Sequence, residues 1–145
     1  MKNTPVTKLE NEPLWKLSNT IAESIYGKLQ EFPDEELWNS SFKLRGSAND
    51  MIFFVALGLG YAGSGGGVED WSSARKHCYA LKTMYRFAGR QKFIDLEPEI
   101  MVKIDEVILG IDLKLRDAKL KNIELDKKEL EPWLEKYQIW KEIQK

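Results

Sequence analysis

Positively charged residues gather in one segment of the sequence, between Trp71 and Ile94, which contains six Lys or Arg and no Asp or Glu. On a helix, four of these cations fall within about 80° of one another, with one tyrosine among them. This basic ridge consists of Arg75, Tyr79, Lys82, Arg86 and Arg90. Cations along a line contact phosphates and an aromatic ring stacks on a base, so the ridge indicates nucleic-acid binding. The alternative is a surface whose cations pair with acids of neighbouring helices or subunits.

A second pattern, formed by Gly58, Gly60 and Gly63, matches the G-x-G-x-x-G motif of dinucleotide-binding proteins. In those proteins a strand precedes the glycines and a helix begins within them. Here an apolar helical pattern precedes them, and six glycines crowd residues 58–67. We therefore interpret the segment as a flexible connection that ends a helix, and the sequence predicts no nucleotide cofactor.

The residues that most often perform catalysis lack suitable neighbours. His77 follows Arg75 and Lys76, without a nearby carboxylate, and is expected to be a surface histidine. Cys78 lies at an apolar helical position and is expected in the core, and one Cys with one His cannot complete a zinc site. The carboxylates after residue 96 lack the Glu-x-x-His pairs of dimetal bundles and are interpreted as a solvated face: Glu97, Glu99, Asp105, Glu106 and Asp112. The sequence thus predicts no catalytic residue, no metal and no cofactor, and a protein that is not an enzyme.

The elements that must position these residues are helices. Apolar residues recur at helical spacing, and no run alternates with the period of a strand. Proline and acidic residues mark where helices start and stop, which predicts helices over residues 13–32, 34–59, 69–92 and about twenty residues from Pro98. Their connections favour an all-α, antiparallel, up-down-up-down four-helix bundle.

The two ends of the chain lie outside this predicted bundle. Residues 1–11 are polar and aperiodic and are expected to be a mobile tail, residues 12–120 to form the bundle, and residues 121–145 an additional amphipathic C-terminal helix. The last helix is expected to begin near residues 126–131 and to carry Trp133 and Trp140. These tryptophans are expected to cap the bundle, and the alternative is an anchor for a partner.

Two apolar lines face away from the predicted core. Phe53 and Phe54 form the first, and Val102, Leu109 and Leu113 form the second, almost opposite the main stripe of their helix. A single small bundle would leave these side chains wet, so they are expected to be an interface with further copies of the chain.

The composition limits the partners and the compartment. The chain of 145 residues has a formal net charge of −1, which by itself favours neither nucleic acid nor an acidic membrane. The N-terminus lacks the apolar core of a secretory signal, and the apolar run over residues 51–60 is too short to cross a bilayer. We expect a cytoplasmic protein without a membrane partner.

Residues 13–118 resemble a known family, the four-helix-bundle proteins encoded in intervening sequences of large ribosomal RNA genes. That superfamily includes the accessory proteins of diversity-generating retroelements. The matching residues are Phe32 and Pro33, then Arg45, Ser47, Ala48, Ala56, Gly58 and Gly60, then Ala74, Leu81, Ala88, Arg90, Phe93 and Ile94. The chain departs from the family at Phe54 and Leu57, which replace two polar side chains, and at Lys82 and Arg86 in a helix that is usually acidic.

The resemblance implies a non-enzymatic bundle that commonly forms a ring-like homopentamer. In the retroelement branch it implies a protein that binds nucleic acid and a reverse transcriptase. Two functional hypotheses remain open at this point. The first is an oligomeric protein that contacts nucleic acid or a ribonucleoprotein partner through the basic ridge. The second is a purely structural homo-oligomer without a nucleic-acid role.

Overall fold

The computed structural model describes residues 5–60 and 67–144, with the side chains of residues 5–7, 125, 126, 129, 130, 133, 134 and 137 outside that description. Its elements are α1 (Pro5–Glu10), α2 (Pro13–Lys28), the 3-10 helices η1 (Leu29–Glu31) and η2 (Asp34–Glu36), α3 (Ser40–Gly60), α4 (Val68–Arg90) and α5 (Pro98–Ile143). The described residues form helices, turns and loops without a strand, which confirms the all-α prediction for this part of the chain.

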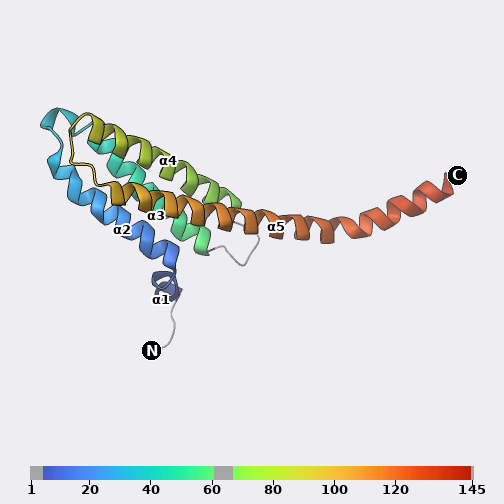
Figure 1. The fold of residues 1–145 in the computed structure, drawn as a ribbon. Coiled ribbons are helices and arrows are strands. Elements are labelled where there is room, and N and C mark those ends of the chain that lie inside the picture. The colour runs from blue at the N-terminus through green and yellow to red at the C-terminus, as the bar shows by residue number, and fades with distance from the viewer. Residues whose placement is uncertain (1–4, 61–66, 145) are drawn as a thin grey trace.

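The four long helices pack in a closed cycle. α2 contacts α3 and α5, and α4 also contacts α3 and α5. Figure 1 shows that the chain reverses its direction from each of these helices to the next. Each helix therefore has two packed neighbours and one side that faces outward.

The apolar stripes of the helices face a common core. On α4 the apolar stripe consists of six buried side chains at helical spacing, and it includes Cys78, which is expected in the core: Trp71, Ala74, Cys78, Leu81, Tyr85 and Ala88. On α5 the apolar stripe opposite the line of Val102, Leu109 and Leu113 is buried from Ile100 to Ile111, and on α2 the side chains of Ile21 and Ile25 are fully buried. Because the inward side of α4 is fixed in this way, the basic ridge lies on its outward side.

Polar contacts hold the start of α5 against α2 and α4. The buried hydroxyl of Tyr85 accepts a hydrogen bond of 2.8 Å from the Glu97 backbone N–H, and burial raises the pKa of Tyr85. Lys28 Nζ lies 3.3 Å from Glu97 Oε1 and 3.4 Å from Glu31 Oε2. Burial alone lowers the pKa of Lys28, but the hydrogen bonds and charges of Glu97 and Glu31 outweigh burial and raise this pKa overall.

Two predicted boundaries near the N-terminus are wrong. Residues Pro5–Glu10 form α1, which contacts α2 and α3, where the sequence predicts a mobile tail. The helix predicted from residue 34 begins at Ser40, because Pro33 is extended and the next residues form the short helix η2. Glu36 Oε2 accepts a hydrogen bond of 3.3 Å from the Ser40 backbone N–H. An acidic residue thus stabilises the N-terminus of α3 from the preceding turn.

The C-terminal prediction is also wrong, because α5 is one helix of 46 residues. It joins the segments predicted as two helices, and the boundary predicted between residues 120 and 121 falls inside it. Asn122 lowers helix propensity only slightly, and Pro132 leaves helical hydrogen bonds on both sides of it. Figure 1 shows the C-terminal half of α5 projecting away from the other helices, so this half does not cap the bundle. None of the helices in the described ranges is long and apolar enough to cross a membrane.

Candidate nucleic-acid interface

The N-terminal end of the basic ridge is tied to α5. Arg75 Nε donates a hydrogen bond of 2.7 Å to Asp112 Oδ1, and this bond with the charge of Asp112 raises the pKa of Arg75. The Arg75 guanidinium also lies over the Tyr79 ring, 5.0 Å from its centroid. Farther along α4, Lys82 Nζ lies 2.5 Å from Asp105 Oδ1. Arg75 and Lys82 therefore agree with the alternative interpretation of the ridge, in which its cations pair with acids of a neighbouring helix.

The C-terminal end of the ridge is different. Arg86 and Arg90 are exposed, and neither forms an ion pair with any residue that the structure describes. They follow Lys82 at intervals of four residues, which places the three cations about 6 Å apart along α4. Arg86 and Arg90 thus present positive charge that no acidic side chain in the described parts of the molecule neutralises, whereas Lys82 pairs with Asp105.

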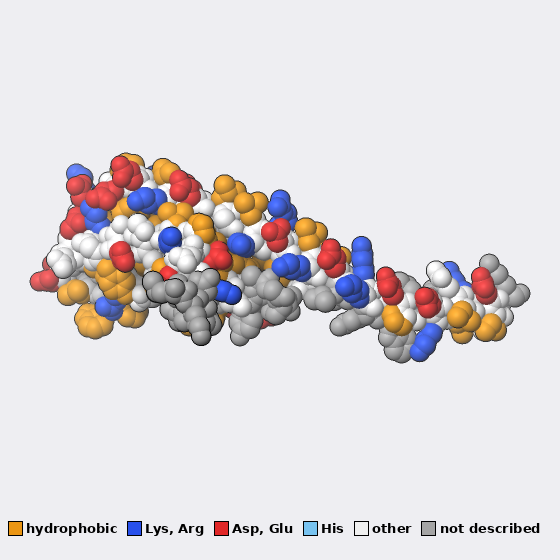
Figure 2. Space-filling model, turned by 90° about the horizontal axis from the view of Figure 1, so that it is seen from below, with side chains coloured by type: hydrophobic (Ala, Val, Ile, Leu, Met, Phe, Trp, Pro, Cys, Tyr) orange, Lys and Arg blue, Asp and Glu red, His pale blue; other side chains and the backbone are white. Residues whose placement is uncertain are grey.

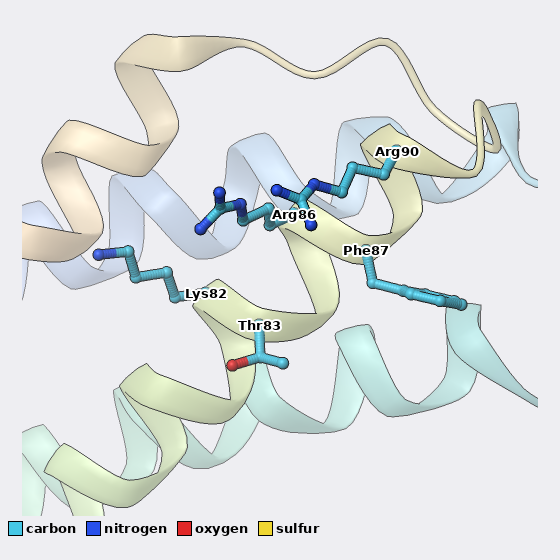
Figure 3. Close-up of a pocket in the computed structure, with 5 residues that line it drawn as sticks. All are labelled: Lys82, Thr83, Arg86, Phe87 and Arg90. Carbon is cyan, nitrogen blue, oxygen red and sulfur yellow. The ribbon is translucent and has the colours of Figure 1, made fainter.

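These cations border a surface hollow of about 370 Å³, the basic hollow, which is lined by Lys82, Thr83, Arg86, Phe87 and Arg90. Figure 3 shows the three cationic side chains on one flank of α4 and Thr83 and Phe87 on the other. The Phe87 side chain is 44% exposed, and one of its edges meets the Phe93 ring at a centroid distance of 6.3 Å. An exposed ring held beside cations and a hydroxyl can stack on a base while the cations contact phosphates.

Phe87 is the residue that the sequence analysis missed. Tyr79 is the aromatic that the helical wheel places among the cations, but its ring is covered on one side by Arg75. Phe87 belongs neither to the core stripe of α4 nor to the predicted ridge. An aromatic side chain at such an exposed helical position is the signal that could have identified Phe87 from the sequence. The structure brings Lys82, Arg86 and Arg90 together around Phe87 and leaves Arg75 and Tyr79 outside the hollow.

A second depression, with a volume of about 630 Å³, lies next to the basic hollow between α3 and α4. Small and apolar side chains of both helices line this α3–α4 groove together with charged and polar ones. The lining residues are Phe42, Lys43, Gly46, Ser47, Asp50, His77, Tyr79, Ala80, Thr83 and Met84. Thr83 lines the hollow and the groove alike, so the two depressions are adjacent.

The residues predicted for an oligomer interface lie on the surface to different degrees. Val102, Leu109 and Leu113 are 55, 62 and 46% exposed on α5. Phe53 is 56% exposed, whereas Phe54 is half-buried and stacks on the His77 ring at a centroid distance of 5.4 Å. The line on α5 is therefore the more continuous of the two exposed apolar lines.

The remaining candidates for chemistry have structural roles. His77 Nδ1 lies 3.6 Å from Asp50 Oδ2, and burial raises the pKa of Cys78 to about 12, which disfavours a reactive thiolate. Of the carboxylates interpreted as solvated, Asp105 and Asp112 pair with the ridge and Glu97 pairs with Lys28. Among the side chains that the structure describes, no cluster of His, Cys, Asp and Glu could hold a metal ion.

The glycine motif also has a structural explanation. Gly58 lies in the last turns of α3 against the Trp71 ring, and a Cβ at this position would come within 2.6 Å of that ring. Gly63, the third glycine of the motif, lies outside the described residues. Close packing between α3 and α4 thus accounts for Gly58 without a bound phosphate.

In comparisons with known proteins, no protein-family model and no curated protein matches the sequence.

Proposed function

We propose that the chain is a non-enzymatic, oligomeric binding protein of the cytoplasm, built as an up-down-up-down four-helix bundle, that contacts nucleic acid through the basic hollow of α4. A ribonucleoprotein, such as a reverse transcriptase with its RNA, is the partner that the family resemblance suggests. The observation that carries this proposal is the exposed pair Arg86 and Arg90, which has no acidic partner in the described molecule, beside the exposed Phe87 ring.

The physical argument separates the ridge into two halves. Arg75 and Lys82 already have carboxylate partners on α5, so a phosphate would have to compete with Asp112 and Asp105. Arg86 and Arg90 have no such competitor, and guanidinium groups bind phosphate oxygens with two parallel hydrogen bonds. The formal net charge of −1 means that nucleic acid would be attracted by this local surface rather than by the whole molecule.

The proposal is tested by the affinity for a fluorescent single-stranded RNA at low salt. Arg86→Glu with Arg90→Glu should weaken binding at least tenfold, because two phosphate contacts become repulsions. The matched control is Lys16→Glu with Lys119→Glu, which changes the net charge equally at two exposed positions away from α4. Undetectable binding by the natural chain, or an equal loss in both double variants, would contradict the proposal.

The second candidate function is a structural homo-oligomer with no nucleic-acid role. The exposed line of Val102, Leu109 and Leu113 favours it, because apolar side chains in a row are covered in most soluble proteins. The family resemblance suggests a homopentamer for such an assembly. Light scattering at micromolar concentration should give a mass above that of one chain, and a monomeric mass would exclude this candidate.

A further inference from the structure

The exposed apolar line on α5 continues from the packed half of the helix into the projecting half. Val102, Leu109 and Leu113 are followed by Leu120 and Ile123, whose side chains are 53 and 49% exposed. At 100° per residue, all five side chains lie within about 80° of one another, on the side of α5 away from the buried stripe. The line is thus available to a partner along both halves of α5.

The spacing of this line from Leu109 onward is that of a coiled coil. Its positions advance by alternating steps of four and three residues, and four seven-residue repeats separate Leu109 from Tyr137. Seven of these positions are apolar and two are cationic. The α5 seam, as we call them, consists of Leu109, Leu113, Arg116, Leu120, Ile123, Lys127, Leu130, Leu134 and Tyr137. A seven-residue repeat drifts by about 20° per repeat around a straight helix, so a partner follows it only by coiling around α5.

The partner of the seam must be a long helix with a matching repeat. The other helices of the bundle, α2, α3 and α4, have 16, 21 and 23 residues, and their apolar stripes are buried in the core. The seam itself spans 29 residues. Among the helices that the structure describes, α5 alone is long enough to pair along the whole seam, with its 46 residues. The α5 helix of a second copy is therefore the partner whose length and repeat match.

Charged side chains beside the seam distinguish the two directions in which a second α5 could run. Asp117, Glu124 and Glu131 are exposed, and each directly follows a seam position that ends a three-residue step, so all three border the same edge of the seam. In an antiparallel pair this edge faces its own counterpart, and acids would meet acids. In a parallel pair Asp117 of one copy meets Arg116 of the other, and both side chains are more than half exposed and available for this contact. Charge complementarity thus favours two parallel copies in register.

The two cations of the seam limit the number of copies. In a pair of helices the long side chains of Arg116 and Lys127 reach water at the edges of the seam. Three or more helices would enclose these cations and remove their charges from water at a large cost in free energy. Figure 2 shows charged side chains among the hydrophobic ones along the projecting end, as expected for a seam that stays open to water at its edges.

We infer that two copies of the chain pair through a parallel, two-stranded coiled coil formed by their α5 seams. Because α5 is one corner of the four-helix cycle, a partner on its outward side leaves the basic hollow of α4 open. The inference goes beyond the proposed function, since it states how the copies associate and does not rest on a contact with nucleic acid. It specifies a pair where the family resemblance suggests a homopentamer.

Disulfide formation tests the partner and its direction. Leu109→Cys and Ile123→Cys are made as separate variants of the full chain and mildly oxidised, and each should form a covalent dimer, because identical seam residues meet in a parallel pair. Lys128→Cys is the matched control, exposed on the far side of the helix, and should stay monomeric on a denaturing gel. Cys78 is buried with a raised pKa and should not react. An antiparallel pair brings a residue to its own counterpart at only one point, so a dimer from one variant alone, or from neither, would overturn the inference.

Sedimentation equilibrium counts the copies and tests the charges of the seam. The natural chain should have twice the mass of one chain, and a monomeric or pentameric mass would contradict the inference. Arg116→Glu should raise the dissociation constant of the pair at least tenfold, because acids of both copies then meet in one layer of the seam. Lys128→Glu makes the same change in charge outside the seam and should have less than a twofold effect. Equal effects of the two substitutions would argue against a contact through the seam.

Nucleic acid is absent from these assays, so their failure leaves the proposed contact with nucleic acid untouched. Conversely, a chain that pairs as expected but shows no affinity for RNA would refute that contact alone.

Discussion

At the scale of single residues, close packing explains a motif that otherwise suggests phosphate binding. Gly58 is buried against the Trp71 ring, and the space where a Cβ would lie is occupied by three ring atoms within 2.9 Å. Gly60, two residues later, has open space at the same position. The two glycines of one sequence motif therefore have different physical reasons to be present.

Gly58→Ala should lower the free energy of unfolding by about 1–3 kcal/mol, because the added methyl group forces Trp71 and its neighbours apart. Thermal unfolding followed by circular dichroism measures the change. Gly60→Ala is the matched control and should be neutral or slightly stabilising, since alanine favours a helix. Equal destabilisation by both substitutions would argue against the packing explanation.

Phe87 supplies a separate test of how the basic hollow recognises its ligand. Phe87→Leu keeps an apolar side chain of similar size but removes the ring that could stack on a base. Loss of about 1–3 kcal/mol of stacking should weaken the affinity for single-stranded RNA by roughly 5- to 150-fold. Affinity for an RNA duplex of equal length should change little, because paired bases are not free to stack, and an equal loss for both RNAs would contradict a stacking role.

Burial of Cys78 predicts a dependence of stability on pH. The pKa of its thiol is raised from 9.0 to about 12 in the folded chain, so the stability it contributes is complete below pH 9 and is lost as the pH rises toward 12. The free energy of unfolding should fall over this window by up to about 1.4 kcal/mol per pH unit from this group. Urea titrations from pH 8 to 10 should show a shallower fall for Cys78→Ala, and an unchanged slope would refute the assignment.

At the scale of elements, periodicity predicts what packs inward but not where a helix ends in the absence of packing. The six buried positions of α4 follow from a period of 3.6 residues, because together they form the side of α4 that packs against α3 and α5. The C-terminal boundary of α5 does not follow in this way, because no neighbouring helix constrains residues beyond the bundle. Pro132 suggests a helix start in the sequence, yet it lies inside a continuous helix.

The position of Pro132 makes the stability of the projecting half testable. Proline removes one helical hydrogen bond and costs about 3 kcal/mol in a helix interior. Pro132→Ala should therefore increase the helical signal in far-ultraviolet circular dichroism and slow amide hydrogen exchange over residues 128–140. Unchanged exchange in this segment would mean that the helix is not continuous through residue 132.

The same distinction applies to the basic ridge. A helical wheel brings five residues to one side of α4, but it contains no information on which acids of α5 lie opposite them. Asp105 and Asp112 neutralise one end of the ridge, and only the packing of α4 on α5 reveals this. The candidate site is therefore smaller than the sequence predicts, and it includes Phe87 in place of Tyr79.

At the scale of the whole molecule, the candidate surface for nucleic acid and the candidate surface for self-association lie on different helices, α4 and α5. Arg86 and Arg90, which have no acidic partner in the described ranges, border the basic hollow next to the α3–α4 groove, and Val102, Leu109 and Leu113 are exposed on α5.

The central claim is that Arg86 and Arg90 contact the nucleic-acid backbone, and the salt dependence of RNA binding measures such contacts directly. The slope of log Ka against log salt concentration is about −0.7 per phosphate contact for a single strand. Replacing both residues, as Arg86→Ala with Arg90→Ala, should make the slope less steep by about 1.4. A slope equal to that of the natural chain would show that neither arginine contacts a phosphate and would contradict the account.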